Sequence, residues 1–171
     1  ASVRFNLDPF NESTDEDIWS VLEQVELKDV IDRLPKKLDD AVAEGGSNFS
    51  VGQRQLICMA RALLRKSKFL IMDEATARLD NETDIFLQKM IRKQFASCTT
   101  LTIAHRLNTI MDSNRVCVMD AGVVAEYDTP YNLLHKENGI FRGMVVAAND
   151  PTLFDMVPDC EDLKSLLEEK G

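Results

Sequence analysis

The sequence predicts an α/β fold built around a parallel sheet, and three observations support this prediction. Short, continuously apolar runs such as Phe69–Met72 are typical of strands that are buried on both faces of a parallel sheet. Segments with helical periodicity alternate with these runs along the chain. The 171 residues, 44% of them hydrophobic, are enough for one domain with a hydrophobic core and too few to predict a second domain.

The first 48 residues are expected to be helical and irregular. Residues 2–10 predict a strand remnant or a loop that a proline closes. Ser13 or Thr14 can cap the next helix, because apolar residues recur behind them at helical spacing: Ile18, Val21, Leu22 and Val25. A second short helix, 27–34, should end at the proline that follows it. Polar, glycine-containing residues 36–48 predict a loop.

The middle of the chain carries the strongest periodic signals. Ser50 resembles the N-cap of a helix that runs to about Arg65 with one apolar stripe. A strand is expected over 68–73, a helix over 82–95 and a second strand over 99–104.

The last third predicts a helical turn, a hairpin and two helices. The turn covers 107–111, and the hairpin strands 116–119 and 123–127 flank Ala121-Gly122. The helices begin at Pro130 and Ile140. Residues 149–171 contain seven acids and two lysines, and we expect a solvated tail, with a docking segment as the alternative.

Composition excludes several classes of function. The formal net charge of -9 argues against a nucleic-acid partner, because a groove for a polyanion needs clustered Lys and Arg. The four cysteines form no CxxC pair and only two histidines are present, which argues against metal chelation and suits reduced thiols. No apolar stretch could span a bilayer and the first residues lack a signal-peptide pattern, so any membrane crossing is expected from another segment.

Paired acids follow the apolar run at Phe69–Met72. A strand there would deliver Asp73 and Glu74 at its carboxyl end, where α/β folds place ligands. Phosphoryl transfer to water needs one carboxylate near Mg²⁺, a role that fits Asp73, and a second to orient or deprotonate the water, a role that fits Glu74. The alternative is that the acids simply mark the point where a buried strand meets solvent.

Two further segments have the chemistry of a phosphate site. His105 ends the next strand, where an imidazole can hydrogen-bond a phosphate or a water, although a structural strand-end histidine is the alternative. Ser50, Gly52 and the positive end of a helix dipole form a natural anion site, although an ordinary capped helix has the same residues. None of the seven glycines belongs to a GxxxxGK[ST] phosphate loop.

Together these segments resemble the nucleotide-binding domain of ABC transporters. FSVGQ at 49–53 resembles the family's signature sequence, KFLIMDE its Walker B strand, ATARLD its D-loop, and TIAHR its H-loop. The surrounding text, including VRFNLDPF, ARALLRKS and VMDAGVVAEYDTP, resembles the second nucleotide-binding domain of subfamily C, the multidrug-resistance-associated proteins. The resemblance covers roughly residues 2–146.

The resemblance implies a P-loop NTPase-type parallel sheet with a helical signature subdomain, incomplete at the amino terminus. It implies a helical subdomain at 1–67, a RecA-like catalytic part at 68–147 and the acidic tail at 148–171. The Walker A loop, the adenine-stacking aromatic residue and the Q-loop are expected to precede the start of this chain. The loss of a neighbouring strand should leave three apolar residues without one flank and prone to association: Leu101, Ile103 and Val118.

The resemblance also implies ATP and Mg²⁺ as cofactors and a role for each motif. The signature residues would contact the γ-phosphate of an ATP held by an opposite domain: Ser50, Val51, Gly52 and Gln53. Asp73 would serve the metal, Glu74 and His105 would be catalytic, and Asp80 would bridge the two sites. Glu74 implies a hydrolysis-competent design, whereas Arg78 and Leu79, which replace small residues, leave the cross-site contact open.

We therefore expect a fragment of an exporter ATPase domain at the cytoplasmic face of a membrane. Its partners would be a second nucleotide-binding domain and transmembrane domains. The isolated chain should not hydrolyse ATP appreciably. The alternative is a non-catalytic module that lends its signature face to a complete partner domain. The acidic balance and the subfamily wording argue against an ABC ATPase of DNA repair or translation.

Overall fold

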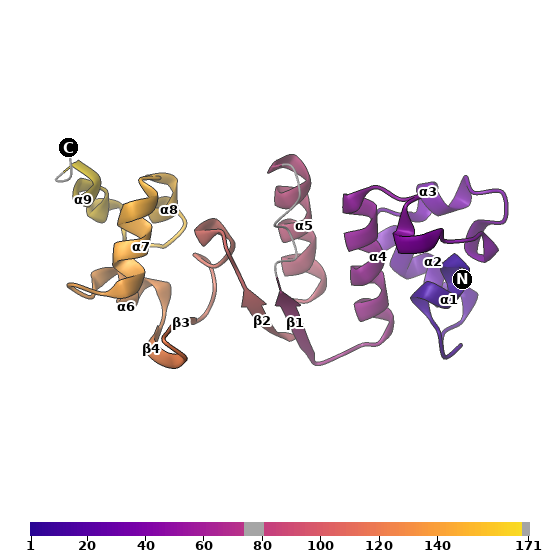
Figure 1. The fold of residues 1–171 in the computed structure, drawn as a ribbon, viewed down its shortest axis with the longest axis horizontal. Coiled ribbons are helices and arrows are strands. Elements are labelled where there is room, and N and C mark those ends of the chain that lie inside the picture. The colour runs from indigo at the N-terminus through magenta and orange to yellow at the C-terminus, as the bar shows by residue number, and fades with distance from the viewer. Residues whose placement is uncertain (74–80, 169–171) are drawn as a thin grey trace. The chain divides into compact units, whose positions relative to one another are not determined.

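The computed structural model describes residues 1–73 and 81–168, apart from the side chains of residues 81, 82 and 168 (Figure 1). The chain forms two compact units, Ala1–Ile103 and Ala104–Gly171, and each is described by itself. These units are defined by packing, whereas the predicted division into 1–67, 68–147 and 148–171 assigns roles. That division stays a prediction.

The first unit combines helices with one pair of strands. Its elements are α1 (Val3–Leu7), α2 (Asp15–Gln24), α3 (Lys28–Asp32), the 3₁₀ turns Lys37–Asp39 and Glu44–Gly46, α4 (Val51–Leu64), β1 (Phe69–Asp73), α5 (Asn81–Gln94) and β2 (Thr99–Ile103).

The strand remnant or loop expected at the amino terminus is wrong, because residues 3–7 form the helix α1. Ser2 caps this helix by accepting the Phe5 N–H at 3.2 Å. The Val3 N–H donates to the Asp40 carbonyl at 2.9 Å. A five-residue helix is too short to be stable alone, so these contacts with a distant loop hold α1 in place.

Thr14, one of the two predicted caps, is the N-cap of helix α2. Its hydroxyl accepts the Asp17 N–H at 3.2 Å, and the Asp17 carboxylate accepts the Thr14 N–H at 3.2 Å. The Thr14 hydroxyl also donates to the Asp17 carboxylate at 2.8 Å, and this hydrogen bond, together with the one from the Thr14 N–H, lowers the pKa of Asp17. The reciprocal capping box fixes where α2 starts.

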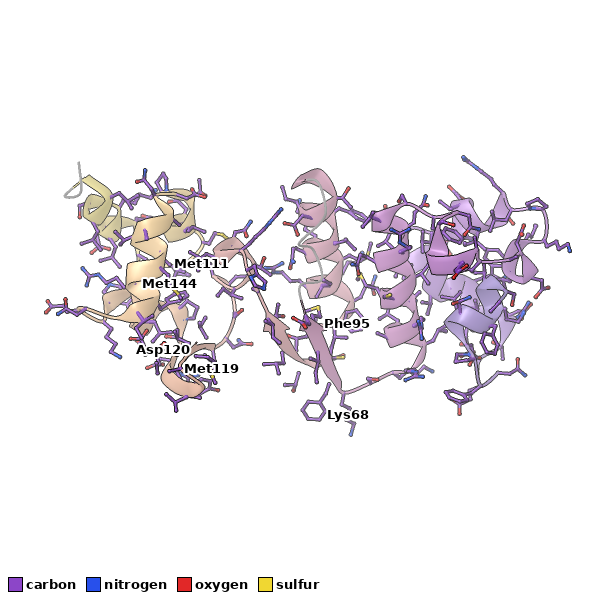
Figure 2. The ribbon with its side chains drawn as sticks, in the orientation of Figure 1. Lys68, Phe95, Met111, Met119, Asp120 and Met144 are labelled. Atoms are coloured by element: carbon purple, nitrogen blue, oxygen red, sulfur yellow. The ribbon has the colours of Figure 1, made fainter. Side chains whose placement is uncertain are left out.

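One apolar core unites α2, α4 and α5. Its buried members include Ile18 and Leu22 of α2, Leu56 and Ala60 of α4, and Leu87 of α5. Phe95, labelled in Figure 2, follows α5 and is 5% exposed in the same core. The three amphipathic helices therefore bury their apolar stripes against one another.

Strands β1 and β2 are parallel, with register from Phe69 opposite Thr99 to Asp73 opposite Ile103. The expectation that β1 is buried on both faces is wrong, because Phe69 and Ile71 are 72% and 70% exposed. Only the face with Leu70 and Met72 packs on the core. The predicted loss of a flank is confirmed for Leu101 and Ile103, which are 59% and 51% exposed.

The second unit packs helices against a hairpin. Its elements are a 3₁₀ turn (Leu107–Thr109), β3 (Val116–Asp120), β4 (Val123–Asp128), α6 (Pro130–His135), α7 (Ile140–Ala148), α8 (Thr152–Asp155), a second 3₁₀ turn (Glu161–Lys164) and α9 (Ser165–Glu168). The antiparallel hairpin is confirmed, with φ of 47° at Ala121 and 81° at Gly122. Two positive φ angles match the twist of a tight hairpin.

Two predictions for the second unit are wrong. Val118 does not lose its flank, because it is 6% exposed within a core that includes Leu134 and Phe141. The solvated tail is also wrong for 152–163, where Phe154 and Cys160 are fully buried. Burial raises the pKa of the Cys160 thiol. The acidic segment has enough apolar residues at helical spacing to pack onto its own unit.

Candidate functional site

The start of α4 is closed by a reciprocal capping box. Ser50 has extended backbone angles, and its hydroxyl oxygen accepts the Gln53 N–H at 3.1 Å. The Gln53 side-chain oxygen accepts the Ser50 N–H at 2.9 Å. The predicted N-cap is therefore confirmed, and the sequence FSVGQ sets the first residue of the helix.

This capping box leaves two backbone donors in the first turn. No preceding turn offers carbonyls to the N–H groups of Val51 and Gly52, and we find no acceptor for them in the described residues. Ser50 is exposed, and Val51 is 42% exposed. The 14-residue helix adds the positive end of its dipole at this point. The arrangement suits an anion.

Arg54 holds the loop that leads into this turn, a contact that sequence reasoning missed. Its guanidinium donates to the carbonyls of Gly46 at 3.2 Å and Phe49 at 3.1 Å. Gly46 has φ of 68°, and a Cβ there would lie 2.8 Å from the Arg54 Cδ. Phe49, 4% exposed, anchors the loop to the core. No periodic pattern predicts a contact between a helix residue and a loop carbonyl eight residues before it.

The Walker B-like strand places Asp73 at its carboxyl end. Asp73 is exposed and lies opposite Ile103, the last residue of β2, so both strands end at one edge of the sheet. Glu74 and Asp80 lie outside the described residues, as do Arg78 and Leu79.

His105 belongs to the second unit, two residues after the end of β2. Its side chain is exposed. Its predicted cooperation with Asp73 and Glu74 stays a prediction, because the two units are described separately.

A cleft of about 250 Å³ lies among α4, β1 and α5. Its described lining includes Cys58, Met59, Leu70, Met72, Leu87 and Ile91, and Asp73 is the one acid among the described lining residues. Burying a charged phosphate among such side chains would cost free energy without paired donors. The cleft is therefore not where phosphates would bind, and the exposed first turn of α4 suits them better.

Comparison with known proteins identifies the family. The model of the ABC transporter family matches residues 2–77. The human protein ATP-binding cassette sub-family C member 4 is 58% identical over 144 residues, which are 84% of this chain. The probable multidrug resistance-associated protein lethal(2)03659 of Drosophila melanogaster is 54% identical over 145 residues. The structure of a bacterial Atm1-family ABC exporter with ATP bound matches with a TM-score of 0.74 and 30% identity over 86% of this chain.

This chain is part of an ABC-transporter nucleotide-binding domain. The predicted α/β fold of this ATPase type is confirmed by the structural match. The chain spans 11% of the length of the human and fly relatives and 26% of the Atm1-family chain. That it corresponds to the second of two such domains stays a prediction.

The described residues of this ABC-transporter domain fit an Mg²⁺ ion that is bound jointly by the protein and a nucleotide. The described residues contain no group of three or more His, Cys, Asp or Glu side chains that could cage a cation. Mg²⁺ usually binds one or two carboxylates together with phosphate oxygens, and the exposed Asp73 offers one such carboxylate.

A membrane crossing is not found in the helices that the structure describes, since none combines enough length with enough apolar residues.

Proposed function

We propose that this chain works within the second nucleotide-binding domain of a subfamily C exporter whose ATP hydrolysis drives transport. The observation that carries the proposal is the exposed, capped start of α4, where Val51 and Gly52 present N–H groups. In the whole protein, this turn would face an ATP held by the opposite nucleotide-binding domain.

The signature residues act as donors in this proposal. Ser50 uses its oxygen to accept the Gln53 N–H, so its hydroxyl proton can point outward. Gln53 uses its side-chain oxygen as an acceptor, which turns its amide donors away from the Ser50 N–H. Both side chains and two backbone N–H groups therefore offer donors to a γ-phosphate.

The acids and the histidine would serve the domain's own nucleotide. Bound Mg²⁺·ATP supplies the phosphoryl group and the charge that neutralises its oxygens. Asp73 would hold the metal, and Glu74 would orient or deprotonate the attacking water. His105 would hydrogen-bond the γ-phosphate or this water, and Asp80 would bridge the two nucleotide sites.

The partners follow from the same proposal. The Atm1-family relative is named an ABC exporter, and this chain spans 26% of it and 11% of the human relative. Transmembrane domains and a second nucleotide-binding domain would then come from other parts of the whole protein. The chain would sit at the cytoplasmic face of the membrane, with no nucleic-acid partner.

A second candidate function is a non-catalytic module that lends its signature face to a complete partner domain. It is supported by the intact signature sequence FSVGQ at 49–53, which forms an exposed, capped helix start. Both candidates require the start of α4 to meet a partner's ATP, and they differ in hydrolysis at Asp73 and Glu74.

Pairing tests the shared step. The chain is mixed with a complete subfamily C nucleotide-binding domain, and association is followed by sedimentation velocity with and without Mg²⁺·ATP. We expect ATP to promote pairing and Ser50→Arg to abolish it, because the larger cation blocks the turn and loses the cap. Ser47→Arg is the matched control, an exposed serine of the same loop that does not cap α4. Wild-type chain that fails to pair would contradict the proposal.

Hydrolysis tests the isolated chain. We expect no magnesium-dependent ATPase rate above background, because positioning and charge stabilisation by a phosphate loop supply most of this catalysis. A rate that disappears in Glu74→Gln would show that the chain positions phosphates by itself.

A further inference from the structure

We infer that Thr83 is a positioning residue for the signature turn, and that the glycine at position 52 is required by this contact within the chain. The packing part stands on the geometry of the first unit. Its consequence for ATP-dependent pairing rests on the proposed function.

Gly52 and Thr83 bring the first turns of α4 and α5 together. A Cβ built on Gly52 would lie 3.0 Å from the Thr83 Cγ2 and 3.9 Å from the Ser50 hydroxyl oxygen. Non-bonded carbon atoms have an optimal separation of about 3.5–4.0 Å. Any side chain at position 52 would therefore press on the Thr83 methyl before it reached the cap.

Thr83 has little room to yield. A β-branched side chain in a helix is stiff at χ1, so its methyl cannot swing aside freely. The next residue, Asp84, is 2% exposed, and Leu87, one turn further, is 1% exposed. Leu87 shares its core with Leu56 and Ala60 of α4. A larger residue at position 52 would therefore tilt the first turn of α4 instead of displacing α5.

A tilt of this turn would reach the donors directly. Ser50, Val51 and Gln53 all lie within two residues of Gly52, and the Ser50–Gln53 capping box depends on their alignment. The structure thus assigns Gly52 a requirement that exists before any ligand binds. A glycine needed only for close approach of a phosphate would show no such requirement in the free chain.

Four proteins test the packing: the wild-type chain, Gly52→Ala, Thr83→Ser and the double variant. Thr83→Ser removes the methyl and keeps the hydroxyl. We expect Gly52→Ala to speed hydrogen exchange of the Gln53 and Arg54 amides about tenfold, the size of a modest overpacking penalty. The double variant should return both amides to within about twofold of the Thr83→Ser protein.

Two controls separate this contact from other effects. Gly143→Ala makes the same change in α7, where a Cβ would meet nothing within 4 Å, and it should not speed exchange of the α7 amides. Thr83→Val keeps a methyl and loses the hydroxyl, so it should fail to rescue Gly52→Ala. Rescue by valine as good as by serine would overturn the inference.

Pairing with a complete nucleotide-binding domain and Mg²⁺·ATP gives the functional readout. We expect Gly52→Ala to weaken pairing about tenfold and Thr83→Ser to restore most of the loss in the double variant. Unchanged amide exchange in Gly52→Ala, or a double variant no better than the single one, would overturn the inference. Absence of pairing in the wild-type chain would instead count against the proposed function, and the exchange result would still decide the packing.

Discussion

The starts of α4 and α7 differ in which residues cap the backbone N–H groups of the first turn. Helix α4 is capped by its own neighbours, Ser50 and Gln53, and its first turn faces solvent. Helix α7 is capped by Glu126 from β4, whose carboxylate accepts the N–H groups of Ile140 at 3.1 Å and Phe141 at 2.9 Å. Glu126 is 6% exposed.

The start of α7 is therefore closed by the protein itself, whereas the start of α4 is accessible to a ligand. At α7, a buried anion already occupies the backbone donors, and Lys136 pairs with it at 2.8 Å. The Lys136 ammonium and the two backbone donors hold the pKa of Glu126 below its ordinary range, although burial acts in the opposite direction. At α4, the N–H groups of Val51 and Gly52 have no acceptor among residues 1–73 and 81–168 and can donate hydrogen bonds to a ligand's oxygens.

The largest effect is expected where the cap is buried. Glu126→Ala should lower the free energy of unfolding of the second unit by about 3 kcal/mol, because two backbone donors lose their acceptor inside the protein. Hydrogen exchange of the Phe141 amide measures the loss. Glu137→Ala, a nearby exposed acid, should change it little. Equal losses in the two variants would remove the contrast between a closed and an open start.

We expect low pH to destabilise the start of α7 selectively, because Glu126 caps it. Because the pKa of Glu126 in the fold lies below its ordinary value of 4.5, ionisation stabilises the second unit above that pH. This contribution is lost as the pH falls below 4.5 toward the pKa in the fold. We expect a smaller effect than truncation, since a protonated carboxyl still accepts one hydrogen bond. Phe141 amide exchange between about pH 6 and pH 3 should lose this acid dependence in Glu126→Gln.

The exposed cap should matter less for stability. Ser50→Ala should lower the free energy of unfolding of the first unit by about 1 kcal/mol, the usual value of an N-cap. Denaturant unfolding followed by fluorescence of the single tryptophan, Trp19, reports on this unit. A loss as large as that of Glu126→Ala would mean that the start of α4 is also held by buried contacts.

The smallest effect is expected at the ion pair. Lys136→Met should cost about 0.5 kcal/mol, because the Lys136 side chain is 53% exposed and its charge is screened by solvent. Phe141 amide exchange again measures it, and Lys89→Met, on α5 in the other unit, is the matched control. A loss near that of Glu126→Ala would show that the ammonium, and not the backbone donors, holds the carboxylate.

The sequence by itself determined the features that depend on neighbouring residues. The caps at Thr14 and Ser50 and the hairpin turn at Ala121-Gly122 are each fixed by residues within four positions, so local patterns predicted them. The motif that includes Asp73 could also be recognised from the sequence, because its residues are consecutive in the chain.

The tertiary structure alone decided the features that join distant segments. The start of α1 is held by a loop 37 residues away, at Asp40, and Glu126 caps α7 from 14 residues away. The burial of Phe154 and the exposure of Ile71 likewise depend on which surfaces meet. The hydrophobic effect is non-directional and does not depend on distance along the sequence. The sequence therefore shows which residues can be buried, whereas the tertiary structure decides which residues they pack against.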